Sequence, residues 1–136
     1  GSSLVGSEMC IRDRDWGHAR DYVEAMWKIL QQKKPDDYVI ATGKQLSIRQ
    51  FINLVTKKLN LKIIWRGKGL KEKGIEVKTK KDIISIDKNY IRPLDVNTLL
   101  GNATKARKKL SWKPRTNIDQ LIEEMISEEI NILNAE

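Results

Sequence analysis

Residues 14–30 read RDWGHARDYVEAMWKIL, and this stretch predicts the first helix of the chain. Its apolar residues recur at helical spacing and form one broad face, which is typical of a helix packed on another layer. The residues of this face are Ala19, Tyr22, Val23, Met26, Trp27 and Leu30. Pro35-Asp36-Asp37 then predicts a turn that ends the helix.

Further along, Tyr38–Ala41 is a near-continuous apolar run, a pattern expected of a strand buried on both faces of a parallel sheet. A second helix is predicted by a capping box, in which Ser47 is the N-cap and Gln50 its partner three residues later. Leu46 and Phe51 fit a hydrophobic staple around this cap, and we expect the helix to continue to Leu59.

Two short strands are predicted next, at Lys62–Trp65 and at Ile83–Ile86. The lysine-rich stretch between them has low hydrophobicity and is expected to be a mobile loop. Two more helices follow, one capped by Asn102 and running to Leu110, and one capped by Asn117 and running to Leu133. The sequence therefore predicts an α/β fold with about four helices and short strands.

The length and composition limit the possible classes of protein. A chain of 136 residues with 40% hydrophobic content is long enough to form one domain with its own core. No apolar run approaches the roughly 20 residues of a membrane helix, so we expect no membrane partner. Cys10 is the single cysteine, which fits a cytoplasmic protein and excludes an internal disulfide or a cysteine-based zinc site.

The single histidine, His18, excludes a multi-histidine metal site. We expect it to orient the turn at Arg14 by a hydrogen bond rather than to act in catalysis. The carboxylates also point to structural positions, because Glu123, Glu124, Glu128 and Glu129 fit the solvated face of the last helix.

The net charge of +8 raises the question of nucleic acid. The densest cluster, Lys68 to Lys81, is interrupted by acidic, small and neutral residues and contains no aromatic side chain for base stacking. The interrupting residues are Glu72, Gly74, Glu76 and Thr79. We therefore expect no nucleic-acid partner and keep a basic nucleic-acid module only as an alternative.

Two arginines, Arg14 and Arg92, stand in rigid contexts and predict a clamp for a phosphate-bearing ligand. The guanidinium group presents a planar fork of donors that matches phosphate oxygens, and Pro93 favours an extended conformation at Arg92. The alternative is that both arginines form ordinary surface ion pairs, which are common and weak.

The signatures of catalysis and of cofactor binding are absent from the sequence. No G-x-G-x-x-G follows a strand, and Gly67-Lys68-Gly69 is the nearest approach to one. No tyrosine is followed four residues later by lysine. We therefore predict no catalytic residue, no cofactor-binding residue and no metal ligand in this chain.

Several motifs nonetheless resemble one enzyme family, in the order in which that family has them. They are RDWGHARDYVEAMW at 14–27, PDDYVIATG at 35–43, YIRP at 90–93, LLGNATKA at 99–106 and LSWKP at 110–114. This set closely resembles GDP-mannose 4,6-dehydratase, a family of the extended short-chain dehydrogenases. The resemblance extends from Arg14 to the last helix.

The resemblance implies a parent enzyme with an N-terminal Rossmann domain for NADP and a smaller C-terminal domain for the sugar nucleotide. The implied lyase reaction converts GDP-mannose to GDP-4-keto-6-deoxymannose, for fucose or rhamnose synthesis. Residues 14–136 correspond to the C-terminal portion, whereas residues 1–13 are expected to be a tag or an artefactual extension. The chain is accordingly expected to be a truncated, inactive form that binds no NADP.

Carried over by position, the resemblance implies that Arg14 and Arg92 lie on the diphosphate side of GDP-mannose. Asp95 stands where the family usually has glutamate near the ribose, and Ile91 stands where it usually has phenylalanine. We expect weak GDP-mannose binding and a homo-oligomer. A self-associating fragment without ligand function is the main alternative, because Tyr38–Ala41 and the first helix would lack the sheet on which they pack.

Overall fold

A computed structural model describes residues 12–91 and 98–135 of the chain. The chain divides into two compact units. The helical unit comprises Arg14–Gln45 and Leu99–Glu136, and the sheet unit comprises Gly1–Asp13 and Leu46–Thr98. In the described residues there are four α-helices and short strands, which confirms the predicted α/β class. No helix among them is long and apolar enough to cross a membrane.

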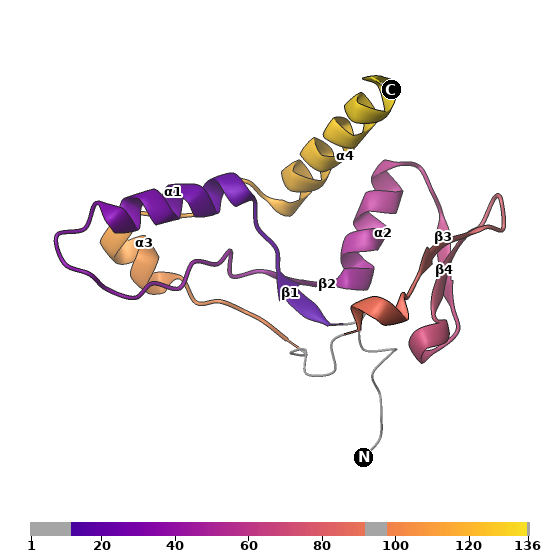
Figure 1. The fold of residues 1–136 in the computed structure, drawn as a ribbon, viewed down its shortest axis with the longest axis horizontal. Helices are drawn as coiled ribbons and strands as arrows, with labels where there is room; N and C mark the ends of the chain where they lie inside the picture. The colour runs from indigo at the N-terminus through magenta and orange to yellow at the C-terminus, as the bar shows by residue number, and fades with distance from the viewer. Residues whose placement is uncertain (1–11, 92–97, 136) are drawn as a thin grey trace, which may run out of the picture. The chain divides into compact units, whose positions relative to one another are not determined.

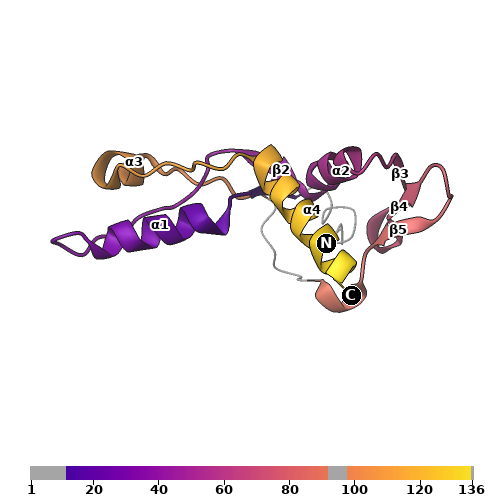
Figure 2. The same ribbon diagram turned by 90° about the horizontal axis from the view of Figure 1, so that it is seen from above.

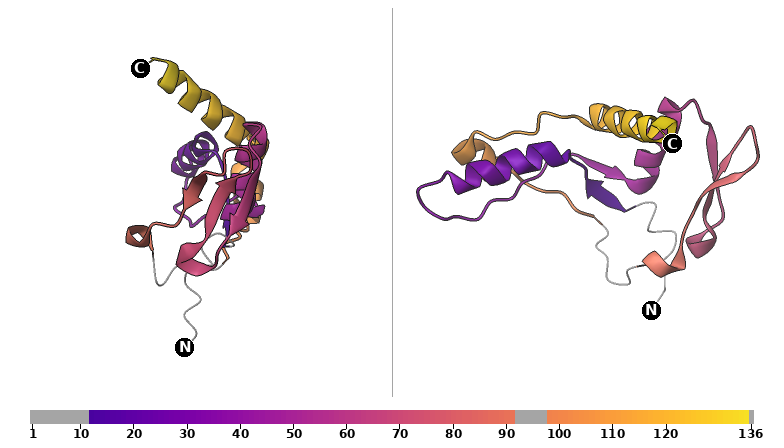
Figure 3. Two further views of the ribbon diagram at one scale, coloured as in Figure 1. Left: turned by 90° about the vertical axis from the view of Figure 1, so that its right-hand side faces the viewer. Right: turned by 45° about the horizontal axis from the view of Figure 1, so that its top comes forward.

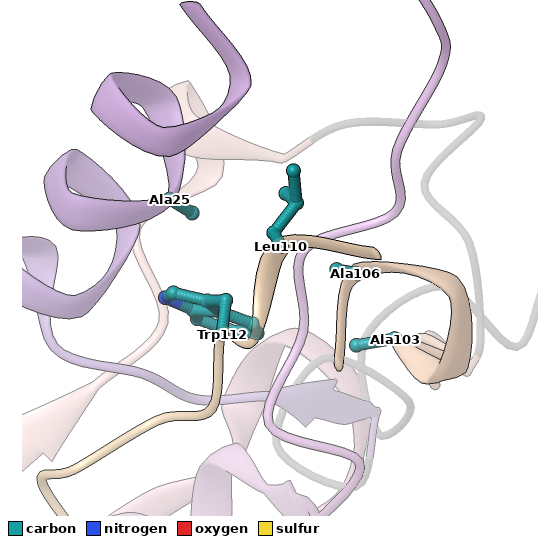
Figure 4. Close-up of a cluster of buried hydrophobic side chains, with 5 residues drawn as sticks. All are labelled: Ala25, Ala103, Ala106, Leu110 and Trp112. Carbon is teal, nitrogen blue, oxygen red and sulfur yellow. The ribbon is translucent and has the colours of Figure 1, made fainter. Parts of the chain in front are cut away.

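The helical unit contains α1 (Ala19–Leu30), α3 (Thr104–Leu110) and α4 (Ile118–Ala135). Helices α1 and α3 lie side by side (Figure 1). Their shared core is built mainly from small side chains, with the ring of Trp112 lying against α1 (Figure 4). The core residues are Ala25, Ala103, Ala106, Leu110 and Trp112. Three alanines at the contact allow the two helix backbones to approach closely.

A buried carboxylate connects α1 to the segment that leads into α4. Asp21 is 3% exposed, and its Oδ2 accepts hydrogen bonds from the backbone N–H groups of Arg115 and Thr116, each at 3.0 Å. The carbonyl oxygen of Asp21 accepts a bond of 2.8 Å from Trp112 Nε1. Each of these polar atoms has a partner, as burial requires.

The sheet unit contains α2 (Ile48–Lys58) and an antiparallel sheet of β3 (Ile63–Arg66), β4 (Lys73–Glu76) and β5 (Asp82–Ser85), in the order β3-β4-β5. Figures 2 and 3 show the three strands lying next to one another. Ile64 pairs with Ile75 and Trp65 with Gly74 across β3 and β4. Two short 3-10 helices, Gly69–Lys71 and Lys88–Tyr90, flank the sheet.

Two predictions about strands were wrong. The lysine-rich stretch is not a loop throughout, because it contains β4, the central strand of the sheet. Its sequence hides this role, since Ile75 is the only large apolar residue in β4 and the strand is held by backbone pairing on both sides. Residues 38–41 form no strand, because none of the described strands pairs with them.

Two of the three predicted helix caps were right. Ser47 and Gln50 form the reciprocal capping box of α2. Asn117 and Gln120 form a second reciprocal pair at the start of α4, with bonds of 2.9 and 3.0 Å. The N-cap of α3 is Ala103, one residue later than predicted, and its side chain makes no capping bond. Asn102 Oδ1 instead accepts a bond of 3.0 Å from the backbone N–H of Thr104, the first residue of the helix.

A buried ion pair stabilises the sheet unit. Glu72 is 4% exposed and pairs with the guanidinium group of Arg49, which also lies 5.0 Å from the centre of the Trp65 ring. The buried hydrophobic residues of the described chain all belong to the helical unit. The sheet unit therefore depends more on half-buried side chains and on this ion pair.

Candidate functional site

Arg14 is the described member of the predicted clamp. It lies in the middle of β1 (Asp13–Asp15), a short strand that pairs with β2 (Gln45–Ser47). Its side chain is half-buried. A strand position with a partly covered stem restricts where the guanidinium group can point, which favours a binding role for a bidentate donor.

The next residue, Asp15, anchors this strand to a loop of the helical unit. Its Oδ1 accepts bonds from the backbone N–H and the hydroxyl of Thr42, at 2.9 and 2.6 Å. Its Oδ2 accepts a bond of 2.9 Å from the N–H of Gly43, whose φ of +77° is in the left-handed region. Three hydrogen bonds to one carboxylate hold the backbone beside Arg14 in a fixed position.

The other end of the motif is fixed by a close approach of Gly17 to Tyr22. A Cβ added at Gly17 would lie 2.3 Å from the hydroxyl oxygen of Tyr22, so a larger residue does not fit there. Burial, followed by the negative charges of Asp15 and Asp21, raises the pKa of the Tyr22 phenol. The phenol therefore stays neutral, and it fills space rather than exchanging a proton.

His18 has a different role from the one that the sequence predicted. It does not orient the turn at Arg14 through its ring; instead it is the N-cap of α1, with Nδ1 accepting a bond of 3.0 Å from the N–H of Arg20. Its Nε2 lies 3.2 Å from Glu124 Oε1 on α4, which also accepts from Arg20. Both ring nitrogens have partners, and the residue is therefore structural.

The clamp as a whole stays a prediction. Arg92 and Asp95 fall outside the described residues, so the structure places Arg14 alone of the three predicted substrate contacts. Arg14 belongs to the helical unit, whereas residues 92 and 95 belong to the sequence range of the sheet unit.

A cation that the sequence reading missed is Arg107, on α3. It lines a cavity of about 320 Å³ together with Gly43 and Asn102, and its Nη2 lies 3.7 Å from a Cβ built at Gly43. Its guanidinium group has no partner among the described residues. The only sequence signal was its place among the basic residues of a helix, which does not distinguish it from Lys108.

One hollow of the sheet unit offers less polar chemistry. A cavity of about 290 Å³ in the sheet unit is lined largely by apolar groups from α2 and β5, with Trp65 and Tyr90 at its sides. No group of three or more potential metal ligands occurs among the residues described, so nothing in that part supports a metal centre.

Comparison with known proteins gives one consistent family. The family model described as GDP-mannose 4,6 dehydratase matches residues 8–125. GDP-mannose 4,6 dehydratase of Dictyostelium discoideum is 49% identical over 120 residues, which are 88% of this chain and 34% of that protein. The Homo sapiens protein of that name is 44% identical over 122 residues, 90% of this chain and 33% of its own length.

A third relative agrees with these two. GDP-mannose 4,6 dehydratase 2 of Caenorhabditis elegans is 46% identical over 125 residues, which are 90% of this chain and 32% of the relative. The chain therefore spans about a third of the length of the curated relatives that it matches.

Proposed function

This chain belongs to the GDP-mannose 4,6-dehydratase family, and from that premise we propose that it supplies part of a GDP-mannose site. Arg14 contacts the diphosphate, and Arg92 with Asp95 completes the nucleotide side. Guanidinium groups suit this task because their donors match phosphate oxygens in pairs.

The observation that carries the proposal is the fixed position of Arg14. Asp15 ties the strand at Arg14 to Thr42 and Gly43 through three hydrogen bonds, which reduces the ordering cost of binding. Such preorganisation is unnecessary for a solvent-exposed ion pair. It therefore favours the ligand clamp over the ordinary surface pair.

We place the chemistry and the NADP of the parent reaction outside this chain. The sequence offers neither a glycine-rich dinucleotide loop nor a tyrosine and lysine four residues apart, which are the groups that the resemblance assigns to cofactor binding and catalysis. The chain alone is accordingly expected to bind GDP-mannose weakly and not to convert it.

Titration with GDP-mannose, followed by NMR or calorimetry, tests this function. Arg14→Ala should weaken binding at least about 10-fold, because a charged hydrogen-bonded contact contributes about 1.5–3 kcal/mol. Arg14→Lys should restore only part of it, since lysine lacks the fork. Lys108→Ala removes an equal charge from an exposed position of the same unit and should change the affinity less than twofold.

Two results would refute the proposal. One is equal weakening by Arg14→Ala and Lys108→Ala, which would show a general charge effect. The other is formation of GDP-4-keto-6-deoxymannose by the chain when NADP is added, which would show that it contains a catalytic site.

A second candidate function is self-association through α1. Its predicted apolar face is largely uncovered, with Val23, Met26 and Trp27 each more than 60% exposed and Leu30 79% exposed. Four large side chains at i, i+3, i+4 and i+7 form a contiguous apolar stripe, which is typical of an interaction surface. A second copy of the chain could cover this stripe with its own.

Sedimentation equilibrium across a range of concentrations tests the second candidate. The wild-type chain should show a concentration-dependent dimer, and Trp27→Glu should leave it monomeric because a charge enters the buried stripe. Lys33→Glu, at an exposed position beyond the helix, should leave the dimer intact. A monomer at every concentration would reject self-association.

A further inference from the structure

The positive charge of the chain is concentrated in one of its two units. Between residues 46 and 98 the sequence holds 13 lysines and arginines against 5 aspartates and glutamates, whereas the remaining residues hold 13 of each. The net charge of +8 therefore lies entirely in this segment. The sequence predicted no nucleic-acid partner because other residues interrupt the lysine run, but the division into units shows that the positive charge is concentrated in one of them.

The acidic residues in and beside the lysine run differ in how much negative charge they place on the surface of the sheet unit. Glu72 is buried against Arg49, so its charge faces the interior of the sheet unit. Gly74 is also buried, in the central strand. Asp82 pairs with Lys73, and Glu76 accepts a bond from the Thr79 hydroxyl. Glu72 and Asp82 are thus neutralised by cations of the same unit, whereas Glu76, bonded to a neutral hydroxyl, keeps its negative charge.

Most of the lysines and arginines of the sheet unit, in contrast, are exposed and unpaired among the described residues. Nine of the described lysines and arginines in this unit are exposed, and their side chains have no hydrogen-bond or ion-pair partner among the described residues. They are Lys57, Lys62, Arg66, Lys68, Lys71, Lys78, Lys80, Lys81 and Lys88. Cations that are left unpaired on one unit produce a net positive field around it.

Four of them gather at one end of the sheet, and we call them the hairpin lysines: Lys62, Lys78, Lys80 and Lys81. The turn between β4 and β5 is closed by bonds of 2.9 Å from Lys80 N–H to the Glu76 carbonyl and from Glu76 N–H to the Lys81 carbonyl. Lys62, just before β3, accepts a bond of 2.8 Å from the N–H of Val77. Backbone bonds thus hold Lys62, Lys80 and Lys81 at the same end of the sheet, and Lys78 lies in the turn between them.

Lys80 occupies an unusual backbone position in this turn. Its φ is +60°, in the left-handed region that glycine or asparagine adopts more easily than lysine. A lysine at such a position carries a local conformational cost, and residues of this kind are concentrated at functional sites. Glycine or asparagine at this position would avoid that cost.

A second group of cations, Arg66, Lys68 and Lys71, lies at the other end of β3 and β4. A strand of four residues is about 13 Å long, a distance over which a nucleic-acid duplex presents about eight phosphate charges. From these observations we infer that the sheet unit binds the phosphate backbone of a nucleic-acid duplex, with the hairpin lysines as its main contact. This inference is independent of the proposed GDP-mannose site.

The composition of the surface favours a backbone contact over other polyanions. Lysine presents a point charge rather than a base-reading fork, and the turn at 77–81 carries no aromatic side chain to stack on a base. It also carries no exposed large apolar side chain of the kind that enters a lipid interface. The binding is therefore independent of sequence and strongly dependent on salt.

Fluorescence anisotropy with a labelled DNA duplex tests the inference on the full chain. If four lysines contact phosphates, log K should fall with log salt at a slope of about −3.6, so that affinity decreases on the order of 100-fold between about 50 and 200 mM salt. The variant Lys78→Gln/Lys80→Asn/Lys81→Gln should lower the slope by about 2.7 in magnitude and weaken binding at low salt more than about 10-fold.

The matched control is Lys33→Gln/Lys34→Gln/Lys113→Gln, which removes the same charge from exposed positions of the helical unit. It should change the affinity less than about twofold. Asparagine suits the left-handed position of Lys80, so the hairpin variant should keep its thermal midpoint, and circular dichroism verifies this. Free GDP should not displace the duplex, because it cannot span the cluster.

Three outcomes would overturn the inference. The wild-type chain could fail to bind the duplex at low salt. The two triple variants could weaken binding equally, which would indicate net charge rather than the hairpin. Vesicles of phosphatidylcholine with phosphatidylserine could bind the chain while the duplex does not, which would assign the surface to membranes instead.

Discussion

At the scale of single residues, glycines in the helical unit mark positions where two backbones approach closely. Gly101 is the clearest case, because a Cβ built there would lie 2.1 Å from the Cβ of Ala41, which is buried. Neither Cβ atom can move easily, because each is bonded directly to the backbone and is not the end of a flexible side chain. The contact couples the segment before α3 to residues 39–41.

Gly101→Ala should therefore destabilise the helical unit by about 1–3 kcal/mol, the usual cost of overpacking. Ala41→Gly in the same chain removes the clashing methyl group and should recover most of the loss, apart from about 0.5–1 kcal/mol for the added glycine. Urea unfolding of the two single variants and the double variant measures the coupling. Additive losses would show that the two positions do not touch.

Asp36 is a residue whose contribution depends on pH. Its carboxylate accepts hydrogen bonds from Lys105 and Lys109, at 2.6 and 3.0 Å, and these bonds lower its pKa well below the ordinary value of 3.8. A depressed pKa in the folded state means that the stabilisation is complete above the ordinary pKa. It is lost as pH falls from about 4 toward the folded-state pKa.

Asp36→Asn should consequently lower the thermal midpoint at pH 7, by a small amount because the group is exposed. The difference from wild type should shrink steadily as the pH falls below about 4. Asp37→Asn is the matched control, since its carboxylate has no partner among the described residues. A difference that stays constant down to pH 2 would contradict the ion-pair explanation.

At the scale of elements, local sequence predicted the helices far better than the strands. The caps at Ser47 and Asn117 are recognisable because each uses residues three apart, and the apolar stripe of α1 repeats within a few turns. A strand depends on the strands that pair with it, and its own residues do not reveal these partners. For this reason β4 was missed and a strand at Tyr38–Ala41 was wrongly expected.

The candidate site shows the same limit. Arg14 could be selected from its motif, but the roles of Asp15 and Arg107 depend on a loop at Thr42 and Gly43 that lies nearly 30 residues from Asp15. No spacing rule relates these positions. Arg14 could be predicted because its own motif identifies it. The roles of Asp15 and Arg107 could not, because they arise from tertiary contacts.

The ion pair between Glu72 and Arg49 is expected to contribute measurably to the stability of the sheet unit. Glu72→Gln should destabilise the sheet unit by about 2 kcal/mol, less than the 3–5 kcal/mol of a fully buried pair because Arg49 is one-third exposed. Replacing both residues by methionine should cost less than the single change. Glu76→Gln, in the adjacent strand, serves as the control in urea unfolding, and an equal loss there would refute the role of the pair.

At the scale of the whole molecule, the two units differ in how they are stabilised. The helical unit contains the seven buried hydrophobic residues of the described chain, whereas the buried residues of the sheet unit are polar or charged. Burial of apolar surface is the main source of stability. The sheet unit is therefore expected to open at a lower free energy.

Hydrogen exchange followed by mass spectrometry measures this difference. Peptides from α1 should exchange slowly, whereas peptides from α2 and β3 should exchange faster by local opening. In the Glu72→Gln variant, exchange should accelerate in the sheet unit and stay unchanged in α1. Equal acceleration in both units would show that the chain unfolds as one cooperative body.

The small side chains between α1 and α3 have a consequence for how this molecule can be mapped. Alanine scanning, the standard means of finding a hydrophobic core, gives no signal at Ala25, Ala103 and Ala106, which are among its most buried positions. A survey made that way would assign the core to Leu110 and Trp112 and overlook the contact between the helices. Only a scan that enlarges residues, with valine or leucine in place of alanine, would detect it.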